Sequence, residues 1–169
     1  MTQRDHVVKW CSYALVFLLV AGLENLVFAR LPIWGVVPVM APLAVVAVGV
    51  FEGSTAGAVF GIAAGVFCDA LYLRSGGGMT IACTLMGLFS GITTQYAFNA
   101  SLAGCSICSV LALVGLDGTR VAVRLVRGAE LDGLLRIAVP EVLYSLVLTL
   151  PIYLMFRAVY RRVGGDKLA

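Results

Sequence analysis

Glycine occupies every fourth position of one apolar segment, at Gly53, Gly57, Gly61 and Gly65, and the next step of four reaches Asp69. Glycine in a helix interior costs about 1 kcal/mol relative to alanine, so this spacing is favourable only where a second helix comes close. Steps of four residues advance about 400 degrees, so the stripe drifts around the helix and suits a right-handed crossing. We expect the stripe to pack helices together, with Asp69 at the polar end of the contact.

The composition is that of an integral membrane protein. Hydrophobic residues make up 61% of the chain and charged residues 12%, with a mean hydropathy of +1.01, whereas soluble domains are roughly half apolar and a quarter charged. The 169 residues suffice for five or six spans of about 20 residues and leave no room for a soluble catalytic domain. No basic run is mixed with aromatic residues, so the sequence gives no support for nucleic-acid binding.

The apolar pattern predicts an all-α fold, a six-helix transmembrane bundle formed by residues 1–169 as one domain. The approximate spans are residues 7–29, 39–51, 55–73, 79–97, 101–124 and 135–159. The first is long enough to span and lacks a cleavage pattern followed by a soluble body, so we interpret it as a membrane helix and not as a cleaved signal. The second is too short for a full crossing and is predicted to be a short or tilted span.

The third and fourth predicted helices are joined by a glycine turn, Gly76 to Gly78. The fourth helix carries its own stripe of small residues, Cys83, Gly87 and Gly91. Two small-residue stripes across a short turn predict a close antiparallel pair. The residues available to cap the start of the third helix are Glu52, Ser54 and Thr55.

Six spans place both termini on one side of the membrane, and Arg4, Lys9 and the basic C-terminal segment favour the cytoplasm. The number of basic residues alone does not decide the orientation in the membrane, because six of the 12 fall on each side. Of the nine acidic residues, six fall on the outer side and three on the inner side, which leaves the +3 net charge inside. The positive excess therefore predicts cytoplasmic termini.

Four acids fall toward the outer ends of four predicted helices: Glu24, Asp69, Asp117 and Glu141. An ionised group at membrane depth costs at least a few kcal/mol unless it is paired or faces water, so such residues are candidates for function. The alternative is that neighbouring arginines neutralise them at the membrane interface. For Asp69 we expect a specific polar contact.

Enzymatic chemistry has little support. His6 is the only histidine and lies in the polar N-terminal tail, so no serine and histidine pair within the membrane. Asp69 and Asp117 lack the sequence surroundings of intramembrane aspartyl proteases. The pattern predicts no enzyme, no cofactor and no metal site, whereas a small-molecule cavity for transport remains compatible with the glycines and acids.

The cysteines all lie in apolar segments and are interpreted as small packing residues. Two of them form a C-x-x-C, but no second pair accompanies it, and redox and metal sites depend on several ligands. The five are Cys11, Cys68, Cys83, Cys105 and Cys108.

Several segments resemble the MreD family of rod shape-determining proteins. They are LPIWGVVP after the first helix, EGSTAGAVFGIAAGVFCDAL with its glycine-spaced helix ending in an acid, the triglycine turn with the small-residue helix after it, and PEVLYSLVLTLPIYLMFRAVYRR at the end. The chain departs from the family where Leu71 to Arg74, LYLR, stands in place of a short Ser-Gly turn.

The resemblance implies a six-helix, non-enzymatic scaffold of the bacterial inner (cytoplasmic) membrane, arranged similarly to the substrate-binding subunit of energy-coupling-factor vitamin transporters. It implies MreC as a partner, and through MreC the peptidoglycan synthase pair RodA and penicillin-binding protein 2 and the cytoplasmic MreB filaments. Two hypotheses follow. In the first, the bundle grips a partner's single membrane helix through a small-residue groove and helps control cell shape and peptidoglycan synthesis. In the second, the acid-rich region is the site of a solute-binding transporter subunit.

Overall fold

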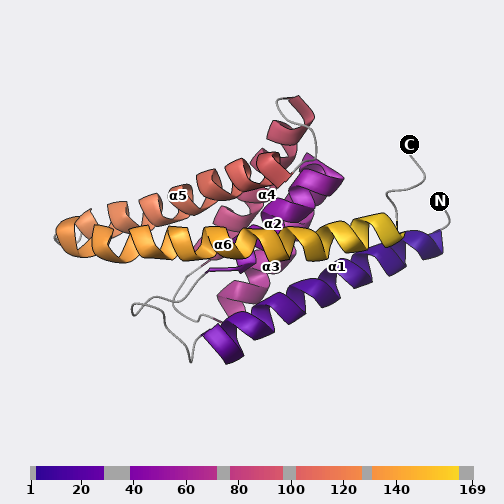
Figure 1. Ribbon diagram of the computed structural model, residues 1–169, viewed down its shortest axis with the longest axis horizontal. Helices are drawn as coiled ribbons and strands as arrows, with labels where there is room; N and C mark the ends of the chain where they lie inside the picture. Colours follow the sequence, from indigo (N-terminus) through magenta and orange to yellow (C-terminus); the bar gives the residue numbers. More distant parts are fainter. Residues whose placement is uncertain (1–2, 29–38, 72–76, 97–101, 127–130, 164–169) are drawn as a thin grey trace.

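The computed structural model describes residues 3–28, 39–71, 77–96, 102–126 and 131–163, and within them the side chains of residues 7–26, 39–71, 77–96, 103–118 and 144–162. All regular secondary structure in this part of the chain is helical (Figure 1), which confirms the predicted all-α class. The elements are α1 (Gln3–Leu23), its π-helical continuation η1 (Glu24–Phe28), α2 (Ala41–Glu52), α3 (Ser54–Leu71), α4 (Gly78–Tyr96), α5 (Leu102–Val126) and α6 (Leu131–Val163).

The short helix α2 is the centre of the fold. Every residue from Ala41 to Val50 is buried, and α2 packs against each of the other five α-helices. A helix that is apolar on all sides must be surrounded by protein or lipid, and here protein surrounds it. Its 12 residues rise about 18 Å, well short of the roughly 30 Å hydrocarbon core of a bilayer. The segment predicted as a short or tilted span is therefore the buried core helix.

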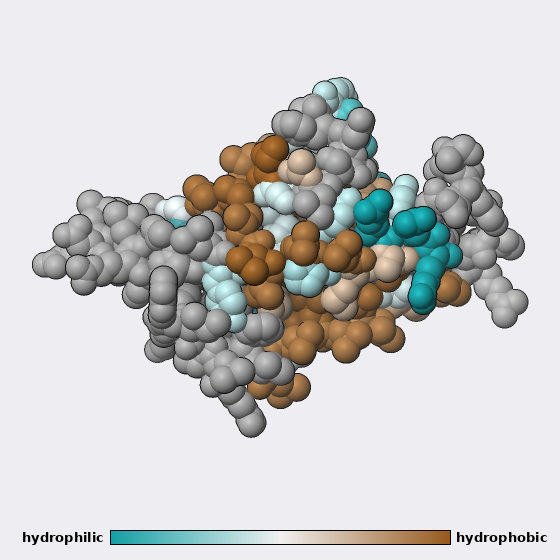
Figure 2. All heavy atoms as spheres, in the orientation of Figure 1, coloured by the Kyte–Doolittle hydropathy of each residue, from teal (hydrophilic) through white to brown (hydrophobic). Residues whose placement is uncertain are grey.

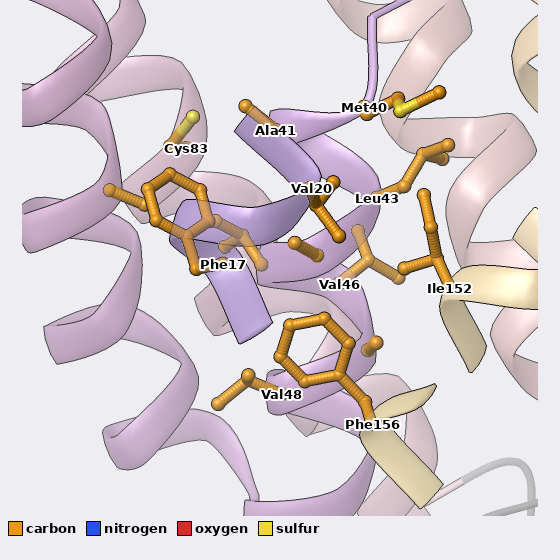
Figure 3. Packing of buried hydrophobic residues seen from close by; sticks show 14 of the residues in the cluster. Phe17, Val20, Met40, Ala41, Leu43, Val46, Val48, Cys83, Ile152 and Phe156 are labelled. Carbon is orange, nitrogen blue, oxygen red and sulfur yellow. The ribbon is translucent and has the colours of Figure 1, made fainter. Parts of the chain in front are cut away.

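The hydrophobic core forms where α1 and α6 meet α2. Figure 3 shows Val20 of α1 and Ile152 of α6 gathered near Val46 of α2, and all three are at most 4% exposed. Aromatic rings extend the cluster: the ring centroids of Tyr13 and Phe156 lie 5.9 Å apart in a stacked arrangement. These contacts fasten the two terminal helices to the central one.

The pairing of small residues gives the helix directions. Gly57 lies opposite Gly87 and Gly65 lies opposite Thr80, so α3 and α4 are antiparallel. Val45 of α2 lies beside Gly87 of α4. Gly49, four residues further along α2, lies beside Ser90, which is three residues further along α4. The two helices therefore run in the same direction. Figure 1 shows that α1 begins and α6 ends at the same end of the molecule.

Two ends of the bundle can therefore be distinguished. We call the end at which α2 begins the Glu24 end, because Glu24 contacts the backbone of Met40 there. We call the end at which α2 finishes the Glu52 end, where Lys9 near the start of α1 reaches Glu52. Helices α4 and α2 begin at the Glu24 end, and α3 begins at the Glu52 end.

The outer faces of the helices carry many exposed large apolar side chains. Figure 2 shows hydrophobic side chains over the middle of the molecule and hydrophilic ones toward the end where α1 begins and α6 ends. In the described residues, two helical segments are long and apolar enough to cross a membrane, Val7–Leu26 and Ser54–Leu71, and Ala41–Glu52 and Ala103–Gly118 are shorter apolar helices.

Candidate functional site

The glycine stripe of α3 lies directly against the backbone of α4. A Cβ atom added to Gly61 would lie 2.5 Å from the carbonyl oxygen of Cys83, and one added to Gly65 would lie 3.0 Å from the carbonyl oxygen of Met79. Such distances leave no space for any side chain, so the two helices pack backbone to backbone. The stripe holds the chain's own hairpin together and is not available as a groove for another protein.

A third glycine brings α2 into the same contact. A Cβ on Gly49 would lie 2.6 Å from the carbonyl oxygen of Gly87, and one on Gly57 would lie 2.7 Å from the Cα of Gly49. Gly49, Gly57 and Gly87 thus form a junction of three helices. Sequence reasoning missed Gly49 because it stands alone in α2, where a single glycine in an apolar run gives no periodic signal.

Gly53 belongs to the connection between α2 and α3 and not to the helical stripe. Its φ of +91° is a conformation that side chains rarely adopt, and its N–H donates to the carbonyl oxygen of Gly49 over 3.0 Å. This glycine ends α2, as glycines with positive φ commonly do. Gly91 of α4 faces it, since an added Cβ there would lie 2.5 Å from the carbonyl carbon of Gly53. The sequence interpretation counted Gly53 in the glycine stripe although it began the third helix at residue 55, and the structure places Gly53 in the connection before that helix.

Asp69 caps the start of α4. Its carboxylate accepts hydrogen bonds from the backbone N–H groups of Met79 at 3.3 Å and Thr80 at 3.0 Å, and from the hydroxyl of Thr80. The first N–H groups of a helix have no partner within the helix, and the helix dipole favours an anion at that position. The polar contact of Asp69 therefore joins the two ends of the α3–α4 hairpin.

Replacing Asp69 by alanine is expected to lower the free energy of unfolding by about 1–2 kcal/mol, because α4 loses its capping carboxylate. Asp69→Asn, which keeps one acceptor oxygen, should lose less, and Thr80→Val should remove only the hydroxyl contact. Thermal unfolding of the purified variants shows whether their losses of stability follow this order. Unfolding of Asp69→Ala at the wild-type temperature would contradict the capping role.

Glu24 performs the corresponding task for α2. Its carboxylate accepts a hydrogen bond from the N–H of Met40 at 3.1 Å, and the residue is 6% exposed. The preceding N–H, that of Val39, donates to the hydroxyl of Ser145 in α6 at 3.2 Å. Glu24 lies in the π-helical turn η1, and π-helical turns are frequent at functional sites. Glu24 and Asp69 therefore each bind the N-terminus of a helix at this end.

The structure describes fewer contacts for the two remaining predicted acids, Asp117 and Glu141. Asp117 of α5 is 7% exposed and is therefore buried in the bundle. Glu141 lies in α6, with its side chain outside the described residues. The arginines considered as their neutralising neighbours also have side chains outside the described residues: Arg30, Arg74, Arg120, Arg124, Arg127 and Arg136.

The Glu52 end contains a polar cluster that sequence reasoning did not find. The Glu52 carboxylate forms an ion pair with the Lys9 ammonium, and the two side chains are each 11% exposed. Its other oxygen accepts a hydrogen bond from the hydroxyl of Tyr13 at 2.8 Å, and Tyr13 is fully buried. The Lys9 Nζ also lies 6.0 Å from the ring centroid of Tyr160 in α6. The cluster joins α1, α2 and α6.

This cluster corrects one prediction. Glu52 was expected to help cap the start of α3, but its carboxylate points back to α1. The physical reason is that Lys9 would otherwise be a buried charge without a counter-ion, which is far more costly than a helix end open to water. Lys9 and Glu52 are 43 residues apart, so no local pattern connects them.

An apolar groove of about 440 Å³ separates α4 from α5. Leu85, Met86 and Phe89 form one wall, and Leu111, Ala112 and Gly115 form most of the other. A Cβ added to Gly115 would meet nothing within 4 Å, in contrast to the packed glycines of α3. The groove is therefore open at a small-residue patch on α5.

The two hydroxyl groups on the α4 wall of this groove are already used within the helix. Ser90 donates to the carbonyl oxygen of Gly87 at 3.1 Å, and Thr93 donates to the carbonyl oxygen of Phe89 at 2.8 Å. Side chains that bond their own helix offer little to a polar ligand. The groove consequently presents an apolar surface.

In the part of the chain that the structure describes, no three His, Cys, Asp or Glu residues come together as metal ligands. Comparison of the chain with family models, with curated proteins and with solved structures gave no match.

Proposed function

We propose that this chain is a multi-pass protein of the bacterial cytoplasmic membrane and a non-enzymatic scaffold of the cell-elongation complex, of the MreD type. In this proposal it binds MreC and through it acts with RodA, penicillin-binding protein 2 and MreB. The sequence resemblance supports the choice of partner. The observation that carries the proposal is the apolar groove between α4 and α5, which is open on a surface that is itself apolar.

Exposed apolar side chains support the membrane location. Soluble monomers rarely expose an apolar patch larger than a few hundred Å², whereas here α1, α3, α4, α5 and α6 each carry exposed large apolar side chains. The segment Val7–Leu26 has 20 residues and rises about 30 Å, which matches the hydrocarbon core. The exposed large apolar side chains include Leu15, Leu18, Leu19, Val59, Ile62, Val66, Ile81, Leu85, Phe89, Leu111, Val114, Val147, Leu150 and Leu154.

The positions of the charged groups support cytoplasmic termini. The Glu52 end holds Lys9 and the exposed Arg157, Arg161 and Arg162 of α6. At the Glu24 end, Glu24 and Asp69 bind helix N-termini. Basic residues concentrate on the cytoplasmic side of membrane proteins, so the Glu52 end is the cytoplasmic one in this proposal.

The groove fits a partner's single membrane helix better than it fits a polar solute. Ala112 and Gly115 allow the close backbone approach that small residues provide at helix interfaces in lipid, where apolar burial alone does not drive association. The glycines of α3 are already occupied by α4. The partner helix is therefore expected against α4 and α5, on the side of α4 away from α3.

Filling the groove should remove the partner without unfolding the scaffold. Gly115→Leu places a branched side chain in open space at the groove wall, and we expect co-purification of MreC from native membranes to fall at least tenfold, the effect of losing about 1.4 kcal/mol. Quantitative mass spectrometry of affinity-purified material measures the fall.

Gly22→Leu is the matched control, because an added Cβ at Gly22 also meets nothing within 4 Å and Gly22 lies on the outer face of α1. This variant should keep MreC. Equal recovery of MreC with both variants, each folded and inserted, would place the partner elsewhere and contradict the proposal.

A solute-binding transporter subunit is the second candidate, and one observation favours it: the groove volume of about 440 Å³ lies within the range of ligand sites. Transporters commonly hold anionic solutes at the N-termini of short helices. Here Glu24 already binds the start of α2 and Asp69 the start of α4. Thermal stabilisation by a vitamin or metal ion would favour this candidate, since a ligand of the folded form raises its melting temperature.

A further inference from the structure

The exposed face of α6 changes from apolar to cationic along its length. Val147, Leu150 and Leu154 are 70%, 52% and 49% exposed, and the next residues at the same spacing, Arg157 and Arg161, are exposed as well. Successive steps of three and four residues place all five on one face of a helix. Figure 2 shows the same change, from hydrophobic over the middle of the molecule to hydrophilic where α6 ends.

The dimensions of this face match one leaflet of a membrane. From Val147 to Arg157 the helix advances ten residues, a rise of about 15 Å. Half of the roughly 30 Å hydrocarbon core is also about 15 Å. The aliphatic side chains therefore extend over the length of one acyl chain, and the arginines stand at the level of the headgroup.

Among the residues whose side chains the structure describes, no carboxylate forms an ion pair with the arginines at this level. The carboxylate of Glu52 is already paired with Lys9, and its second oxygen is bound by Tyr13. The guanidinium of Arg157 lies 6.0 Å from the ring centroid of Tyr153, a cation–π distance that orients it. An arginine fork binds two phosphate oxygens at once, which suits it to this ligand.

We infer that this face of α6 binds an anionic phospholipid of the inner leaflet. Arg157 and Arg161 hold the phosphate, Arg162 adds to the positive field, and the acyl chain lies along Val147, Leu150 and Leu154. The inference rests on the membrane location and orientation of the proposed function, and it adds a lipid ligand at a surface separate from the α4–α5 groove.

Native mass spectrometry of the purified full-length chain tests the inference, with phosphatidylglycerol and phosphatidylcholine of identical acyl chains offered in equal amounts. Each arginine near an anionic surface contributes about fivefold, so a preference for phosphatidylglycerol on the order of 100-fold is expected. The variant R157Q/R161Q/R162Q should bind both lipids about equally. R30Q/R74Q/R120Q changes the net charge by the same amount and should keep the preference.

Two further measurements separate the outcomes. Inorganic phosphate at the same concentration as the lipid should not displace it. Displacement would show that the arginines bind free anions and would overturn the inference. Recovery of MreC is measured in parallel. Wild-type protein that recovers MreC and binds both lipids equally would overturn the lipid site alone, whereas a chain that does not insert into membranes would overturn the proposed function as well.

Discussion

Gly61→Leu is expected to prevent α3 from packing on α4, whereas Gly115→Leu is expected to leave the fold intact. At Gly61 the new side chain would start 2.5 Å from a backbone oxygen and 2.9 Å from the Cα of Thr84. Backbone atoms cannot rotate away, so the whole helix must shift. At Gly115 the same side chain would meet nothing within 4 Å.

Alanine at the same two positions gives a finer test, because two effects oppose each other. Alanine gains about 1 kcal/mol over glycine in a helix interior. Overpacking against well-packed neighbours costs about 1–3 kcal/mol and more where only backbone can move. We therefore expect Gly61→Ala to destabilise by about 2 kcal/mol and Gly115→Ala to be neutral or to stabilise by up to about 1 kcal/mol.

Thermal unfolding of the four variants, with membrane insertion checked separately, measures this contrast. We expect Gly61→Ala to melt below the wild-type temperature and Gly115→Ala to melt at or above it. If Gly61→Ala melted at or above the wild-type temperature, the close approach of α3 and α4 would be disproved. If instead α3 and α4 pack as described, loss of MreC in Gly61→Leu is a result of misfolding and does not identify a binding surface.

The second large effect is expected at Glu52. Glu52→Gln leaves the ammonium of Lys9 in a site where its side chain is only 11% exposed, and breaking a buried ion pair by removing one partner costs about 3–5 kcal/mol. Tyr13→Phe removes only the hydroxyl bond to Glu52 and should cost about 1 kcal/mol. Equilibrium unfolding of the purified variants gives both values.

A double-variant cycle separates the ion pair from the two side chains. Lys9→Met combined with Glu52→Gln removes both charges, so most of the loss seen in Glu52→Gln should be recovered. The coupling between the two positions is expected to be at least about 2 kcal/mol. Purely additive losses would show that the lysine has another counter-charge and that the cluster does not hold α1 to α2.

The α3–α4 pair could be predicted from sequence because its signals are local. The glycine stripe is followed along the chain by a glycine turn and then by a second small-residue stripe. The short turn makes the two helices neighbours, and the two stripes let them pack closely. The capping contact of Asp69 follows from the same arrangement, since the turn returns the start of α4 to the end of α3. Gly53 shares the four-residue spacing of the stripe but lies in the connection between α2 and α3, because periodicity alone does not show where one helix ends and the next begins.

The central place of α2 and the Lys9–Glu52 ion pair could not be predicted in this way. An apolar segment of this length does not show whether lipid or protein will surround it, and only its neighbours decide. The ion pair joins positions 43 residues apart, so it depends on tertiary packing. The available signal was that both residues fall on the inner side of the predicted topology.

The packed glycines also explain why a groove exists. The glycine face of α4, at Cys83, Gly87 and Gly91, is held against α3 and α2. The bulky face of α4, with Leu85 and Phe89, is left to line the space beside α5. Close packing on one side of α4 thus leaves an apolar cleft on the other.

Photo-crosslinking in living cells can locate the partner helix on the scaffold. A photoreactive amino acid replaces Leu111, which lines the α4–α5 groove, or Leu18, which lies on the outer face of α1, and mass spectrometry identifies the adducts. If the partner helix lies in the α4–α5 groove, an MreC adduct should form from position 111 and none from position 18. An MreC adduct from position 18 alone, or lipid adducts only from position 111, would contradict it.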